Sequence, residues 1–250
     1  MKLALPFAAV LATKNDPRSM SRETRSATSP RHPDRVKASR PRSRGRVFAS
    51  IAQYRMCYIW PMSVLIIGLA LFLGIHLLTT LRGTRAAVIG RLGENGYKGL
   101  YSLVAAAGLI LIFIGFGSYR SAGYIQVWNP PFSLFHPVAL FLLWFAFLAL
   151  TATYAPPSRI KSLLRHPMLV AVKVWALSHL LVNGDLGSMV LFGSLLAWAI
   201  YDRIAVKRRG DPGAPPIGWS INDVLVVGLG TVAYVAMLWL HDSLIGVTAA

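Results

Sequence analysis

Apolar segments long enough to cross a lipid bilayer recur after residue 61, and they constrain the fold more than any other feature. We identify six of them, at about residues 62–81, 98–118, 133–154, 167–183, 186–202 and 221–240. A hydrocarbon core about 30 Å thick needs about 20 helical residues to cross it. Because lipid offers backbone groups no hydrogen-bond partner, each segment has to be helical. The sequence therefore predicts an all-α fold, a polytopic membrane bundle of about six transmembrane helices.

The composition agrees with this fold and excludes several other classes of protein. Apolar residues make up 55% of the 250 residues and charged residues only 14%, against about 25% in soluble domains. So few charges could not cover the surface of a soluble enzyme of this size. Cys57 is the single cysteine, which excludes an intrachain disulfide, a four-thiolate zinc site and a cysteine-ligated iron–sulfur cluster.

The first 61 residues form a distinct part of the chain. They hold 13 of the 26 Lys and Arg residues, and their Arg-, Ser- and Pro-rich stretch has few large apolar residues. Such a stretch cannot bury enough surface to offset its ordering entropy, so we expect a disordered basic extension. Residues 62–245 form the membrane domain and residues 246–250 a short tail. The formal net charge of +17 raises the question of nucleic acid. Because all the basic residues except Lys173 lie in this extension and in the loops between spans, we expect no nucleic acid partner.

The loop charges predict the orientation of the bundle. The first, third and fifth loops carry eleven basic residues, whereas the second carries only Arg120 and the fourth none. The odd-numbered loops should therefore face the cytoplasm, which puts the basic extension on the opposite side, against the same rule. Either a cleaved signal segment exports the extension, or the true start of the protein lies near Met62. We favour the start near Met62.

Two histidines lie inside predicted spans, where an ionisable side chain is costly and calls for an explanation. His76 is in the first span and His179 in the fourth, where it shares a helix face with Val172 and Trp175. Two neutral imidazoles facing each other across a bundle suit the axial positions of a haem iron. Alternatively, each donates a hydrogen bond to a neighbouring helix as polar glue. The spacing leaves both readings open.

A second candidate feature precedes the fourth span. Arg165 and His166 stand directly before Pro167, which suits the first turn of a helix. The pair could hold a phosphate or a carboxylate at the positive end of that helix.

Three stretches closely resemble the NnrU family of bacterial membrane proteins. They read HLLTTLRG, RHPMLVAVKVWALSHLLVNGD and LAWAIYDRIAVKRR, and the likeness runs from Met62 to about Ile245. The resemblance implies a multi-pass protein of the bacterial inner membrane, linked to nitrite and nitric oxide reduction in denitrifying bacteria. It also agrees with a start near Met62.

A relative of this family, the 15-cis-zeta-carotene isomerase of plants and cyanobacteria, is a membrane haem b enzyme. Its two ligand histidines match His76 and His179, its RHP segment matches Arg165, His166 and Pro167, and its tryptophan matches Trp175. The resemblance thus implies haem b held by His76 and His179, with Trp175, Arg165 and His166 beside it. The relative's alternative cysteine ligand falls on Ala176, so ligand exchange cannot operate here.

Three functions follow as expectations. The first is a haem b protein with a redox or accessory role in nitrogen-oxide metabolism, working with a membrane redox partner. The second is a haem-dependent cis–trans isomerase of a polyene. The third is a cofactor-free assembly factor or transporter, in which the histidines only join helices.

Overall fold

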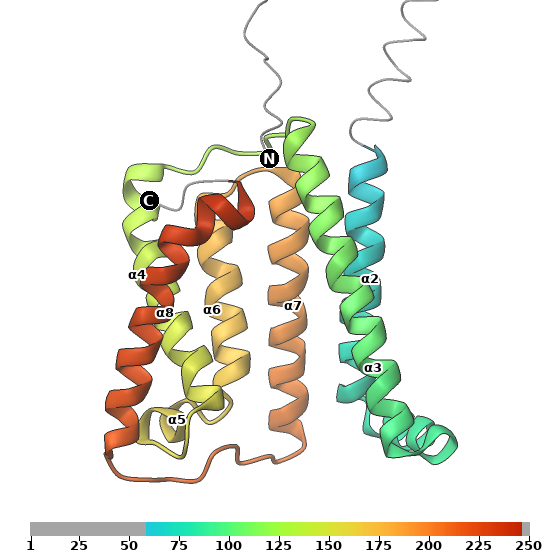
Figure 1. Ribbon diagram of the computed structural model, residues 1–250, viewed down its shortest axis with the longest axis vertical. Helices are drawn as coiled ribbons and strands as arrows, with labels where there is room; N and C mark the ends of the chain where they lie inside the picture. Colours follow the sequence, from blue (N-terminus) through green and yellow to red (C-terminus); the bar gives the residue numbers. More distant parts are fainter. Residues whose placement is uncertain (1–58, 247–250) are drawn as a thin grey trace, which may run out of the picture. The chain divides into compact units, whose positions relative to one another are not determined.

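The computed structural model describes residues 59–246 (Figure 1). Two predictions concern residues that the structure hardly describes: the basic extension over residues 1–61, and the true start of the protein near Met62. Residues 1–58 lie outside the described part of the chain. The helices are α2 (Trp60–Thr80), α3 (Arg82–Ser121), α4 (Phe132–Tyr154), the short α5 (Arg159–Leu164), α6 (Pro167–Val182), α7 (Leu186–Arg208) and α8 (Ile221–Ile245). No helix or strand besides these is present in the described residues, so the all-α prediction is confirmed.

Six apolar helices stand where the sequence predicts spans. Five of them, α2, α3, α4, α7 and α8, are long and apolar enough to cross a membrane. The sixth, α6, has 16 residues and a length of roughly 24 Å, shorter than a bilayer core. A short connection over residues 183–185 joins α6, which ends at Val182, to α7, which begins at Leu186.

One stretch predicted as a loop is helical. Residues 82–97 belong to α3, and the single residue Leu81 separates the end of α2 from the start of α3. The helix α3 bends at Gly93. The backbone of Gly93 has φ 71° and ψ 169°, a conformation that is essentially restricted to glycine. The loop was predicted because this stretch is rich in basic residues. Its apolar residues Ala86, Val88 and Ile89 instead favour a helix with an apolar face.

Glycines bring α2 and α3 into close contact. A Cβ atom added to Gly68 would lie 2.7 Å from the backbone nitrogen of Ile112, and one added to Gly108 would lie 2.7 Å from that of Phe72. Small residues of this kind let transmembrane helices approach until their backbones touch. The pair α2–α3 is therefore packed through its backbones.

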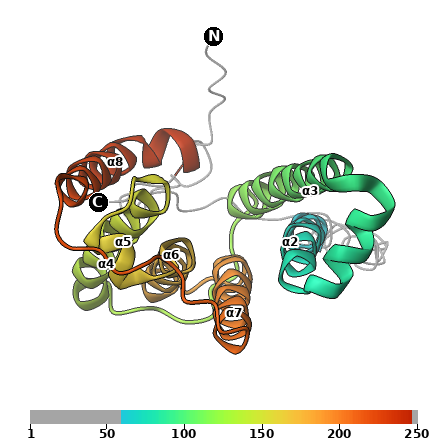
Figure 2. The same ribbon diagram turned by 90° about the horizontal axis from the view of Figure 1, so that it is seen from below.

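The helix α7 lies between α6 and the α2–α3 pair (Figure 2). A buried core joins these four helices, with Leu65 and Leu69 from α2, Ile112 from α3, Ala176 from α6, and Leu191, Phe192 and Leu195 from α7. On the far side of α6, α4 packs against both α6 and α8. The indole nitrogen of Trp144 on α4 donates a hydrogen bond of 3.0 Å to the hydroxyl of Thr231 on α8.

The basic segments of the chain gather at one end of the bundle. The α2–α3 connection, α5 and the segment between α7 and α8 all lie at the lower end in Figure 1. We call this the basic end, formed by residues 81–98, 155–166 and 203–220, and call the other the opposite end. The bundle thus separates its charge as the predicted orientation requires.

Candidate functional site

His76 lies on α2, close to the basic end, in a polar contact with α3. Its Nε2 atom is 2.9 Å from the hydroxyl oxygen of Tyr101, and its Nδ1 atom is 2.6 Å from the carbonyl oxygen of Phe72. The ring of Trp198 on α7 meets the imidazole edge-on, with 5.3 Å between ring centroids. Three helices therefore surround this half-buried imidazole, and both of its nitrogens are within hydrogen-bond reach of a partner.

One turn further along α2, a second polar contact ties α2 to α7. The buried hydroxyl of Thr80 donates a 2.7 Å hydrogen bond to the carboxylate of Asp202. The carbonyl oxygen of Thr80 accepts a 3.2 Å hydrogen bond from the guanidinium of Arg209. We call His76, Thr80, Tyr101, Trp198 and Asp202 together the His76 cluster.

The sequence did not single out Tyr101 or Asp202 as partners of this cluster. Asp202 could have been found, because it lies in the last turns of an apolar helix, where a carboxylate is unusual. Tyr101 carries no such signal, since tyrosine is common near membrane interfaces.

A pocket opens at the basic end beside the cluster. It has a volume of about 990 Å³, and both Thr79 and Tyr101 line it. Tyr101 therefore both lines the pocket and holds its hydroxyl within hydrogen-bond reach of the half-buried imidazole of His76.

His179 lies in a different place, near the opposite end of α6. Its Nδ1 atom is 2.9 Å from the carbonyl oxygen of Trp175, and its imidazole stacks on Phe192 of α7 with 4.4 Å between centroids. The ring of Trp175 also contacts both His179 and Phe192. The predicted aromatic face around His179 is thus present, and α7 covers it.

Among the interactions of the described residues, no contact joins His76 and His179. His76 contacts Trp198 whereas His179 contacts Phe192, and these two partners lie six residues apart, roughly 9 Å along α7. Axial ligation of one haem by the two imidazoles stays a prediction.

Comparison with known proteins now identifies the family. The sequence pattern described as NnrU protein matches residues 64–249, about three quarters of the chain. The chain belongs to the NnrU family. No curated protein and no solved structure matches it, so the relationship of this NnrU protein to the carotene isomerase stays a prediction.

Arg165 and His166 of this NnrU protein lie at the basic end, between α5 and α6. Arg165 ends α5 with φ 60°, and its carbonyl oxygen accepts a 2.9 Å hydrogen bond from the nitrogen of Ala214. His166 precedes the first turn of α6, and its buried Nε2 has no partner among the described residues. The contacts of Arg165 are those of a chain turn fixed against the α7–α8 segment.

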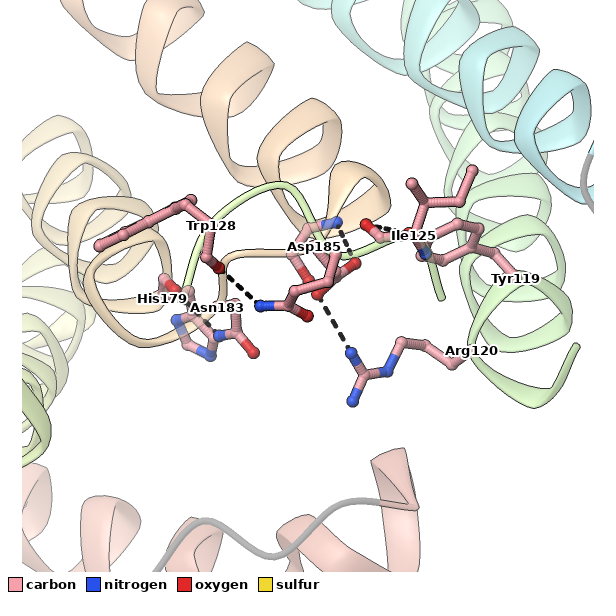
Figure 3. A network of polar contacts seen from close by, with 9 residues as sticks. Tyr119, Arg120, Ile125, Trp128, His179, Asn183 and Asp185 are labelled. Atoms are coloured by element: carbon pink, nitrogen blue, oxygen red, sulfur yellow. Dashed lines mark hydrogen bonds and ion pairs between the residues drawn. The ribbon is translucent and has the colours of Figure 1, made fainter. Parts of the chain in front are cut away.

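A network of polar contacts occupies the opposite end (Figure 3). The carboxylate of Asp185, 2% exposed, accepts hydrogen bonds from the nitrogen of Ser188 at 3.0 Å and from the guanidinium of Arg120 at 3.1 Å. Asp185 thus caps α7 and links it to the end of α3. Arg120, the single basic residue of the predicted second loop, thus has a structural role through its ion pair with Asp185.

Proposed function

We propose that this NnrU protein has an accessory or redox role in nitrite and nitric oxide metabolism, and that His76 and Tyr101 are where it exchanges a proton. The observation that carries the proposal is the 2.9 Å contact between the imidazole and the hydroxyl of Tyr101, a residue that lines the pocket. Ionisable groups inside membrane helices mark functional sites by default, since their burial is costly. The loop charges support an inner-membrane protein whose basic end faces the cytoplasm.

The contacts of His76 support one path for the proton. The Nδ1–H group donates to the carbonyl oxygen of Phe72, so the neutral imidazole carries its lone pair on Nε2 and accepts there from the hydroxyl of Tyr101. When Nε2 takes the tyrosine proton, the phenol oxygen takes one from a donor in the pocket. The imidazole gains one proton for each proton that the donor in the pocket gives up. The same transfers in reverse return the proton to the pocket.

Haem b is a second candidate, favoured by a feature that the two histidines share. Each has its Nδ1 atom hydrogen-bonded to the carbonyl four residues before it. In metal sites such a bond fixes Nε2 as the nitrogen that binds. The polyene isomerase gains no support, because the fully buried Ala176 offers no replacement ligand.

The optical spectrum of the purified full chain, oxidised and then reduced with dithionite, tests the haem candidate. A near-stoichiometric b-type signal that is lost in both His76→Ala and His179→Ala would support it and would point to a membrane redox partner. A folded but colourless protein, produced with ample haem, would reject it.

Replacing Tyr101 by Phe tests the proton-exchange proposal. The change removes only the hydroxyl next to His76, and Tyr234→Phe on α8 is the matched control, because its ring packs on Phe147 away from the cluster. In cells whose own gene is deleted, we expect Tyr101→Phe to slow nitrite consumption severalfold and Tyr234→Phe to restore it fully. Full restoration by Tyr101→Phe at equal membrane levels would reject the proposal and favour an assembly factor or transporter.

A further inference from the structure

Most residues that line the pocket at the basic end take no part in the proton exchange proposed for His76 and Tyr101. We call it the basic pocket. Its cationic lining residues are Arg82, Arg85, Lys98 and Arg209, and its hydroxyl-bearing ones are Thr79, Tyr97, Tyr101 and Ser102. No lining residue carries a carboxylate. Lys98 forms a 2.9 Å ion pair with Glu94, so the three arginines supply most of the positive charge that attracts a negatively charged ligand.

A buried hydroxyl points to the same ligand. Tyr97 is only 5% exposed, lines the basic pocket, and its hydroxyl has no hydrogen-bond partner among the described residues. Buried polar groups are normally paired, so an unpaired one calls for an explanation. An oxygen-rich ligand in the basic pocket would accept the missing hydrogen bond.

Two of the arginines are already held near this hydroxyl. The guanidinium of Arg85 lies over the ring of Tyr97, 5.4 Å from its centroid. Arg209 is anchored by its bond to the carbonyl oxygen of Thr80, which leaves its other N–H groups available. Guanidinium groups donate paired hydrogen bonds to phosphate oxygens, a geometry that lysine cannot reproduce.

The basic pocket also has an apolar side and lies where the apolar helix α2 ends. Ala86, Ile89 and Gly90 line it, and they belong to the segment of α3 that follows the end of α2. A ligand held here meets charges on one side and the apolar surface of the helices on the other. This combination suits an amphiphile whose headgroup is anionic.

We propose that the basic pocket binds the phosphate group of an anionic phospholipid. Arg82, Arg85 and Arg209 bind the phosphate oxygens, and the hydroxyl of Tyr97 donates a hydrogen bond to one of them. None of these four residues belongs to the His76 cluster, although Tyr101 of that cluster lines the same pocket.

The test uses the full chain in detergent, with native mass spectrometry to count and rank bound phospholipids. Short-chain phosphatidylglycerol, kept below its micelle concentration, is the probe. Phosphatidylcholine of the same chain length is the zwitterionic comparison, and inorganic phosphate is the competitor without acyl chains. We expect one phosphatidylglycerol to bind at least tenfold more tightly than phosphatidylcholine, with inorganic phosphate competing only weakly.

Three variants assign the binding to the basic pocket. The double variant Arg85→Gln with Arg209→Gln should weaken phosphatidylglycerol binding at least tenfold, and Tyr97→Phe should weaken it severalfold. Arg208→Gln is the matched control, because Arg208 is exposed on α7 next to Arg209 but does not line the basic pocket. Its binding should equal that of the unsubstituted protein.

Other results would overturn the proposal. Unchanged binding in the folded double variant would place the phospholipid elsewhere. Equal affinity for phosphatidylcholine would show that the headgroup charge is not recognised. Inorganic phosphate binding as tightly as phosphatidylglycerol would make this a site for the free ion. Since Tyr101→Phe leaves all proposed phosphate ligands in place, failure here and failure of the proton exchange are separable.

Discussion

The imidazole Nε2 of His76 on α2 lies 2.9 Å from the hydroxyl oxygen of Tyr101 on α3. The two residues are held in place by helices that a single residue, Leu81, connects. The contact therefore depends on how closely α2 and α3 pack. Gly68 and Gly108, which allow this close packing, help to position His76 and Tyr101.

Gly108→Ala tests this packing. The added Cβ would lie 2.7 Å from the backbone nitrogen of Phe72, so the helices have to separate, at a cost of about 1–3 kcal/mol. Gly117→Ala on the same helix is the control, because nothing lies within 4 Å of its added Cβ. Unfolding by denaturant in mixed micelles measures both. Equal stability of the two variants would mean that α2 and α3 are further apart than described.

Asp185→Ala should destabilise the opposite end. The buried carboxylate caps α7 and pairs with Arg120, and loss of a cap alone costs about 0.5–2 kcal/mol. Asp242→Ala, an exposed position on α8, should leave the free energy of unfolding nearly unchanged. The same denaturant assay compares the two, and a loss of equal size in both variants would contradict the structural role of Asp185.

Gly93→Ala should change both stability and the basic pocket. At φ 71° and ψ 169° an alanine is strained by about 1–3 kcal/mol, and relief of that strain reorients the segment that carries Arg82 and Arg85. Gly99→Ala, with open space around its Cβ, is the control. We expect weaker phosphatidylglycerol binding and lower stability for Gly93→Ala only. Equal stability and equal phosphatidylglycerol binding in the two variants would contradict a role for the bend at Gly93.

The sequence predicts the helices well because each apolar span has to be helical in lipid, whatever its neighbours are. A helix stands at each of the six predicted spans, and five of these helices are long and apolar enough to cross a membrane. The helical segment before Gly93 was missed, because its basic residues were interpreted as a loop.

The order of the helices in space could not be predicted in this way. His76 and His179 both lie inside apolar spans, and their spacing along the chain says nothing about whether α7 separates α2 from α6. The contact between Thr80 and Asp202 was missed for the same reason, since it joins residues 122 positions apart. Only the packed structure shows that His76 meets Tyr101.

The central claim is that His76 and Tyr101 act as one unit, and a double-mutant comparison of nitrite consumption tests it most directly. His76→Gln, Tyr101→Phe and the double variant are each expressed in cells that lack their own copy, at equal membrane levels. If the two residues share one proton path, each single change should slow nitrite consumption to a similar extent, and the double variant should be no slower. Normal consumption in both single variants, or losses that multiply in the double variant, would contradict the claim.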